Sequence, residues 1–138
     1  MAQKNVGKEW SKVVHVKSSL QPKPEQYAMF VGRWQPLHDG HKALFNRALE
    51  EGKKVWIAIR DVEPDEKNPW TAEEVLLNIS NNYASLISSN KLYVSIIPDI
   101  CSVEFGRGVG YDIIEHVPPT AVGEISATKI REKMKNGQ

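Results

Sequence analysis

Hydrophobic residues gather along the chain in two kinds of segment, short continuous runs and longer stretches in which they recur with helical spacing. The short runs predict strands because they are bulky, rich in β-branched residues and bounded by turn residues. Three such strands are residues 28–32, 55–59 and 92–97, and residues 111–116 are a fourth predicted strand. Continuous apolar strands of this kind are typical of a parallel sheet that is buried on both faces.

Helical spacing lies between the predicted strands. It covers residues 41–51, ends near Gly52, and starts again after Thr71, a predicted N-cap with Glu74 at the capping-box position. A last, strongly basic helix is predicted at the C-terminal end, capped by Ser126. This alternation predicts an α/β fold, a Rossmann-like open parallel sheet with right-handed crossovers and helices on both faces. A ligand crevice is then expected at the carboxyl ends of the strands.

The first 27 residues are polar, lysine-bearing and interrupted by Pro22 and Pro24. Residues 13–16 could pair as a short edge strand, but the prolines predict an extended arm or linker. We therefore expect an N-terminal arm over residues 1–27 and one domain over residues 28–138, a length that can bury a core.

Composition limits the classes of function. Eighteen lysines and arginines nearly balance 17 acidic residues, so there is no broad basic surface for nucleic acid, and any phosphate site must be local. The single cysteine cannot form an internal disulfide, and no apolar run is long enough for a signal segment or a membrane span. We expect a cytoplasmic protein without a membrane partner, and a homo-oligomer stays open.

Two histidines, His38 and His41, stand where the first predicted strand passes into the first predicted helix. Backbone N–H groups at such a turn attract anions, so the imidazoles would meet phosphate. Two histidines fall short of the three or four protein ligands of a zinc site, and the other candidate ligands are scattered. The pattern favours phosphate over a protein-bound metal.

A second polar cluster, residues 124–131, carries two hydroxyls and two cations at the predicted start of the last helix. A helix start with cations is a second candidate phosphate site. The plainer alternatives are that Ser126 is only an N-cap and that Arg131 is a solvated helix cation.

The two clusters together resemble the HxGH and ISxTxxR signatures of the nucleotidyltransferase superfamily, which includes the cytidylyltransferases. The resemblance implies a HUP-type fold and transfer of an NMP unit from an NTP, ATP or CTP, to a phosphorylated acceptor with release of pyrophosphate. It assigns catalytic charge stabilisation to His38, His41 and Arg131. It assigns nucleotide or phosphate binding to Gly32, Arg33, Gln35, Gly40, Ser126, Thr128 and Lys129. Mg²⁺ is the implied cofactor, held by phosphate oxygens and water without a protein ligand.

Residues 32–41 and 68–72 are further similar to the GRFQPxHxGH and NPFTxxER segments of archaeal-type nicotinamide-mononucleotide (NMN) adenylyltransferases. Trp70 would then stack on a base or an acceptor ring, or else it covers the loop into the next helix. Val75 stands where that family has an arginine, and the chain between the third strand and the last motif is short. Two alternatives therefore stay open, a small cytidylyltransferase of the glycerol-phosphate type and a non-catalytic nucleotide-binding module.

Overall fold

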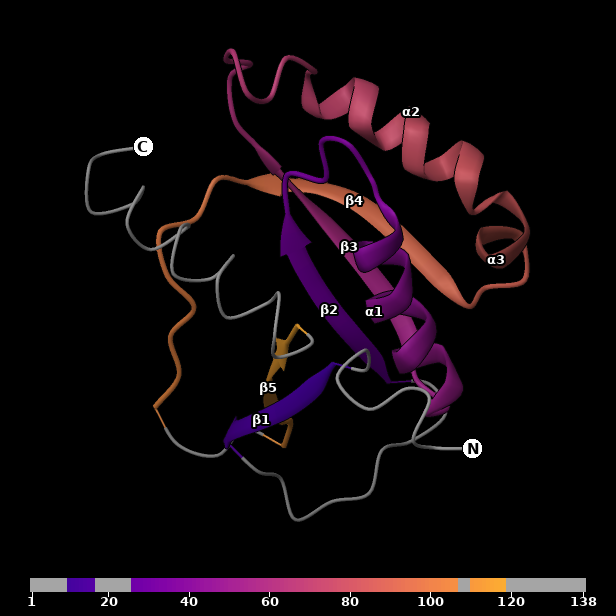
Figure 1. Ribbon diagram of the computed structural model, residues 1–138, viewed down its shortest axis with the longest axis vertical. Coiled ribbons are helices and arrows are strands. Elements are labelled where there is room, and N and C mark those ends of the chain that lie inside the picture. The colour runs from indigo at the N-terminus through magenta and orange to yellow at the C-terminus, as the bar shows by residue number, and fades with distance from the viewer. Residues whose placement is uncertain (1–9, 17–25, 107–109, 119–138) are drawn as a thin grey trace. The chain divides into compact units, whose positions relative to one another are not determined.

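The computed structural model describes residues 10–16, 26–106 and 110–118 (Figure 1). The described residues fall into two compact units, one within residues 21–104 and one that combines the N-terminal part with residues from Phe105 onward. The predicted boundary between an arm at 1–27 and a domain at 28–138 stays a prediction.

The larger unit contains a three-stranded parallel sheet. Its strands are β2 (Tyr27–Gly32), β3 (Lys54–Asp61) and β4 (Leu92–Pro98), in the order β2-β3-β4. All three strands agree with the sequence prediction, apart from one or two residues at their ends. The parallel α/β class is confirmed.

Three helices connect these strands. Helix α1 (Asp39–Glu50) links β2 to β3, and α2 (Ala72–Asn82) with the short α3 (Ala84–Ser88) links β3 to β4. The hydrophobic periodicity predicts both long helices, although α1 begins two residues earlier than expected because His38 caps it.

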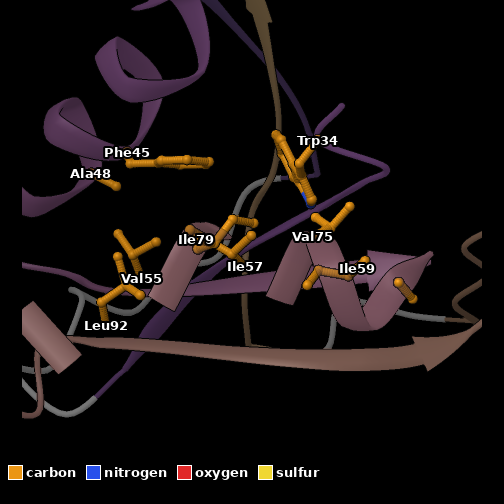
Figure 2. Close-up of a cluster of buried hydrophobic side chains, with 10 residues drawn as sticks. Trp34, Phe45, Ala48, Val55, Ile57, Ile59, Val75, Ile79 and Leu92 are labelled. Carbon is orange, nitrogen blue, oxygen red and sulfur yellow. The ribbon is translucent and has the colours of Figure 1, made fainter. Parts of the chain in front are cut away.

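Both long helices pack on the same face of the sheet. The strand order moves one way through the sheet, so two right-handed crossovers place α1 and α2 on one side. The core confirms this, because Val55, Ile57 and Ile59 alternate along β3 and join Phe45 of α1 and Ile79 of α2 in one buried cluster (Figure 2). The predicted helices on the second face would have to come from outside the described residues, and they stay a prediction.

The second face of the sheet carries large side chains that are partly exposed. Met29, Trp56 and Tyr93 are register partners across the three strands, and Met29 and Tyr93 are 47% and 51% exposed. The cluster of large buried side chains therefore lies on the helix-covered face, and Ala58 is the buried residue of β3 on the second face.

The smaller unit contains β1 (Ser11–Val16) and β5 (Ile113–Val117), which pair as an antiparallel ribbon. The predicted edge strand at 13–16 is thus confirmed. The placement of the fourth strand in the parallel sheet is wrong. β5 pairs with β1 instead, and the described residues between β4 and β5 contain no helix of the kind that usually connects parallel neighbours.

Within the described residues, no helix combines the length and the apolar character needed to cross a bilayer.

Candidate functional site

The candidate site lies where the parallel strands of the larger unit end. Loop 33–38 follows β2 and leads into α1, and loop 62–71 follows β3 and leads into α2. Because parallel strands end at the same edge, the N-termini of both helices lie at this edge of the sheet (Figure 1). Free N–H groups and the helix dipoles make such an edge favourable for anions.

The two histidines cap α1 reciprocally. His38 is the N-cap residue, with extended backbone angles, and its Nδ1 accepts a hydrogen bond from the Gly40 N–H at 3.1 Å. The His38 N–H in turn donates to Nδ1 of His41 at 3.3 Å. The rings stack with centroids 3.6 Å apart and 22° between their planes. This first turn therefore holds both imidazoles side by side.

The capping bonds also select the tautomer of each histidine. A nitrogen that accepts a hydrogen bond carries no proton, so Nδ1 is the bare nitrogen in both neutral rings. The proton must then sit on Nε2, the nitrogen that faces away from the backbone. His38 and His41 thus offer two neighbouring Nε2–H donors, a suitable pair for phosphate oxygens.

Burial lowers the pKa of His41 from 6.5 to about 4, helped by repulsion from the neighbouring His38 ring. His41 is therefore neutral at pH 7, and its Nε2–H is available as a hydrogen-bond donor without a positive charge. The sequence predicts that both histidines are exposed. This is correct for His38 and wrong for His41, which is half-buried.

Trp34, which the sequence analysis did not single out, packs against the His41 ring. Trp34 is only 8% exposed, and its Nε1–H donates to the Ala58 carbonyl of β3 at 3.1 Å. Its ring meets the His41 ring edge to face, with centroids 4.9 Å apart and planes at 85°. An aromatic residue inside a strand-to-helix turn next to two histidines is the signal that could have revealed it.

Gly32 makes room for this indole. A Cβ at position 32 would lie 3.0 Å from the Trp34 ring, closer than such atoms normally approach. The absence of a side chain at Gly32 thus has a structural reason, and its nucleotide-binding role stays a prediction.

Arg33 and Gln35, both expected to bind phosphate, reach across to loop 62–71. The Gln35 amide pairs with the backbone of Trp70 at both ends, since Nε2 donates to the Trp70 carbonyl at 2.9 Å and Oε1 accepts from the Trp70 N–H at 2.8 Å. Arg33 donates to the Asp65 carboxylate and to the Glu63 carbonyl, each at 3.1 Å. The two loops are therefore tied together before any ligand binds, and the phosphate contacts of both residues stay predictions.

Asp65, another residue that the sequence analysis missed, organises loop 62–71. Its Oδ1 accepts from the N–H groups of Lys67 and Asn68, at 2.9 and 2.8 Å, and its Oδ2 faces Arg33. The Asn68 N–H is the main cause of a lowered pKa of the Asp65 carboxyl, and the Arg33 guanidinium adds to it. An aspartate two and three residues before the amides it binds is an Asx-type turn.

The side chains of Trp70 and Val75 both pack against the core. Trp70 is half-buried against the core cluster, and Val75 is fully buried within it. The Trp70 side chain thus packs against the core at the end of loop 62–71. Its stacking on a ligand ring stays a prediction. In this chain position 75 belongs to the core of α2 and supplies no cation to the site.

The second predicted cluster, Ser126, Thr128, Lys129 and Arg131, lies outside the described residues, so its roles stay predictions. Among the residues that the structure does describe, no group of three or more His, Cys, Asp or Glu side chains could hold a metal ion.

Paired imidazole donors at a helix N-terminus in a parallel α/β unit are an arrangement suited to binding phosphate. Comparison with known proteins narrows the class of protein. A family described as cytidylyltransferase-like matches residues 29–79, which include the histidine pair and both loops.

Curated relatives agree with this match. The nicotinamide-nucleotide adenylyltransferase of Methanocorpusculum labreanum is 28% identical over 134 residues, 80% of each chain. That of Thermoplasma volcanium is 28% identical over 144 residues, 86% of this chain and 81% of the relative. The nicotinamide/nicotinic acid mononucleotide adenylyltransferase of Acinetobacter baylyi is 34% identical over 73 residues, 51% of this chain and 39% of the relative. The chain is thus similar to members of the nucleotidyltransferase superfamily, both in its family-model match and in its curated relatives.

Proposed function

We propose that this chain is an enzyme that transfers an NMP unit from an NTP to a phosphorylated acceptor and releases pyrophosphate, with ATP and NMN as the first pair to test. The observation that carries the proposal is the reciprocal His38–His41 cap, which presents two Nε2–H donors at the N-terminus of α1. The adenylyltransferase names of the relatives support the choice of substrates.

The chemistry suits these groups. A phosphate oxygen of the acceptor attacks the α-phosphorus and forms a new P–O bond, while the bond from the α-phosphorus to the bridging oxygen breaks and pyrophosphate leaves. Negative charge moves onto the phosphate oxygens in the transition state, so fixed donors lower the barrier without a covalent nucleophile. The neutral His41 imidazole can supply such a donor over the pH range above its lowered pKa.

The tied loops support preorganisation of the site. Gln35 and Arg33 fix loop 62–71 relative to loop 33–38, so the two helix N-termini keep their spacing in the free protein. A site that is already arranged spends less binding energy on ordering itself when substrate arrives.

Mg²⁺ belongs to the proposal as the counter-ion of the triphosphate. Mg²⁺ usually keeps most of its water ligands and binds substrate phosphates, so the proposal needs no protein cage for the ion. The ion would supply charge neutralisation on the leaving pyrophosphate. The proposed setting is the cytoplasm, and the proposed substrates are small molecules rather than nucleic acid.

A second candidate pair is CTP with glycerol phosphate. The cytidylyltransferase-like description of the matching family favours it. A third candidate is a nucleotide-binding module without turnover. Val75 favours it, because this residue is buried and the site therefore lacks one arginine that the resemblance implies.

The test is a pyrophosphate-release screen in Mg²⁺ that combines each of four NTPs with NMN, glycerol phosphate, phosphocholine or pantetheine phosphate. Release that needs both ATP and NMN supports the proposal, and release that needs CTP and glycerol phosphate supports the second candidate. Calorimetric binding of ATP or CTP without release for any pair rejects the enzyme and leaves the module.

The His41→Ala variant ties any release to the site. Loss of a donor that acts mainly in the transition state should lower kcat by about 10²–10³ with little change in KM for the NTP. His15→Ala is the matched control, since His15 belongs to the smaller unit and pairs with Glu115. A His41→Ala enzyme with the kcat of the unaltered protein would remove the histidine from the mechanism.

A further inference from the structure

We propose that Trp34 is the positioning residue of His41, fixing the orientation in which the His41 ring presents its Nε2–H to phosphate. The inference deepens the proposed function and rests on it for its kinetic arm alone. The observations behind it are the contacts that His41 makes with other side chains of the protein.

The indole is anchored at its far end. Trp34 Nε1–H donates to the carbonyl of Ala58, a fully buried residue in the middle of β3, at 3.1 Å. Because β3 is the central strand, it is paired with a neighbouring strand on each side of this anchor. Figure 2 shows the Trp34 side chain among the labelled core residues.

The contact with His41 leaves that ring little freedom. Trp34 lies edge to face with it at 4.9 Å, and His38 stacks on it at 3.6 Å. A rotation of the His41 side chain would lose the stack, the edge contact and the hydrogen bond from the His38 N–H together. The His41 ring thus contacts the Trp34 indole as well as the His38 ring.

The backbone of loop 33–38 is adapted to this placement. Trp34 has a φ of +56°, a region that few residues other than glycine adopt, and Gly32 has no Cβ where the indole lies. Unusual backbone angles persist only where the surroundings hold them, and they cluster at functional sites. The loop therefore holds this indole against both the sheet and the histidine.

A purely structural role is the competing explanation, since Trp34 also meets Phe45 edge to face at 5.3 Å. The experiment therefore uses two variants, Trp34→Leu and Trp34→Phe. The matched control is Trp56→Phe, because the Trp56 indole also donates a hydrogen bond, to the Ser95 hydroxyl at 2.9 Å, but on the other face of β3.

The first measurement is an NMR titration of the imidazole nitrogens in the ligand-free full chain. In the unaltered protein His41 should show the Nε2–H tautomer and titrate near the lowered value. In Trp34→Leu we expect its pKa to rise by at least one unit and the tautomers to mix, with a smaller change in Trp34→Phe and none in Trp56→Phe. An unchanged His41 titration and tautomer in both Trp34 variants would overturn the proposal, even if both melt at lower temperature.

The second measurement is steady-state pyrophosphate release. A mispositioned donor should lower kcat at least tenfold in Trp34→Leu with KM for the NTP changed less than threefold, and Trp34→Phe should recover part of the loss. Equal losses in Trp34→Phe and Trp56→Phe would show a general packing effect and overturn the proposal. Because the NMR measurement needs no turnover, failure of the proposed function and failure of the positioning role give different results.

Discussion

At the scale of single residues, the candidate site depends on which ring nitrogen of His38 and His41 carries the proton. His41 is neutral because its ring leaves water for a place between Trp34 and His38, and the two capping bonds direct its proton to Nε2. The pattern of the sequence predicts the two histidines and their helix start. It does not predict the tautomer, because that depends on amide groups whose positions are defined only when the helix forms.

The lowered pKa of His41 makes stability depend on pH. The unfolded chain binds a proton near pH 6.5 and the folded chain only near pH 4, so the free energy of unfolding should fall as pH drops through this window. With allowance for solvent screening we expect a loss of about 1–2 kcal/mol. Urea unfolding of the unaltered protein and of His41→Gln at pH 7 and pH 4.5 measures it. Parallel pH profiles of the two proteins would contradict the prediction.

Tyr83 offers a second test at this scale. Its hydroxyl is buried with no hydrogen-bond partner among the described residues, and burial raises its pKa. Removing an unsatisfied buried hydroxyl relieves a desolvation cost, so Tyr83→Phe should leave stability unchanged or raise it by up to about 1 kcal/mol. Thermal unfolding measures this, with the exposed Tyr93→Phe as control. A loss of more than about 1 kcal/mol would mean that the hydroxyl has a partner.

At the scale of elements, the sequence predicts helix starts whose signals are local. Thr71 and Glu74 form the expected capping box, with bonds of 3.0 and 3.1 Å. The bonds of Arg33 and Gln35 to loop 62–71 could not be predicted in the same way. Their partners lie 30 to 35 residues away and include backbone carbonyls and amides, which carry no sequence pattern.

The capping box gives a prediction for α2. Thr71→Ala removes the acceptor of the Glu74 N–H and should lower the free energy of unfolding by about 1 kcal/mol. Ser88→Ala is the control, because the exposed Ser88 hydroxyl donates only to the Ser85 carbonyl of the short α3. Chemical denaturation of both variants decides it, and equal stabilities would show that the cap contributes nothing measurable.

At the scale of the whole molecule, the sequence predicts which segments form strands, but only part of how these strands pair. The parallel order of β2, β3 and β4 follows from helices that separate them, a pattern visible in the sequence. The pairing of β5 with β1 joins residues about 100 positions apart, and no periodicity reports such a contact.

The last prediction concerns Arg131 of the C-terminal cluster. If Arg131, which lies outside the described residues, binds the same triphosphate as His38 and His41, then Arg131→Ala should raise KM for the NTP about ten- to a hundredfold, through loss of a charge-assisted contact. The thermal stabilisation by ATP should shrink accordingly, because it grows with the ratio of ligand concentration to Kd. The melting temperature without ligand should barely change.

Lys135→Ala is the matched control for this test, since it removes a cation of the same C-terminal segment outside the motif. It should leave both the KM and the ATP-dependent melting shift unchanged. Equal effects of the two variants would mean that the segment acts through its general positive charge, and an Arg131→Ala protein with unaltered ATP dependence would separate the C-terminal motif from the phosphate site. The histidine cap of α1 would then be the site's phosphate-binding element by itself, because its two donors are held by the fold of the larger unit alone.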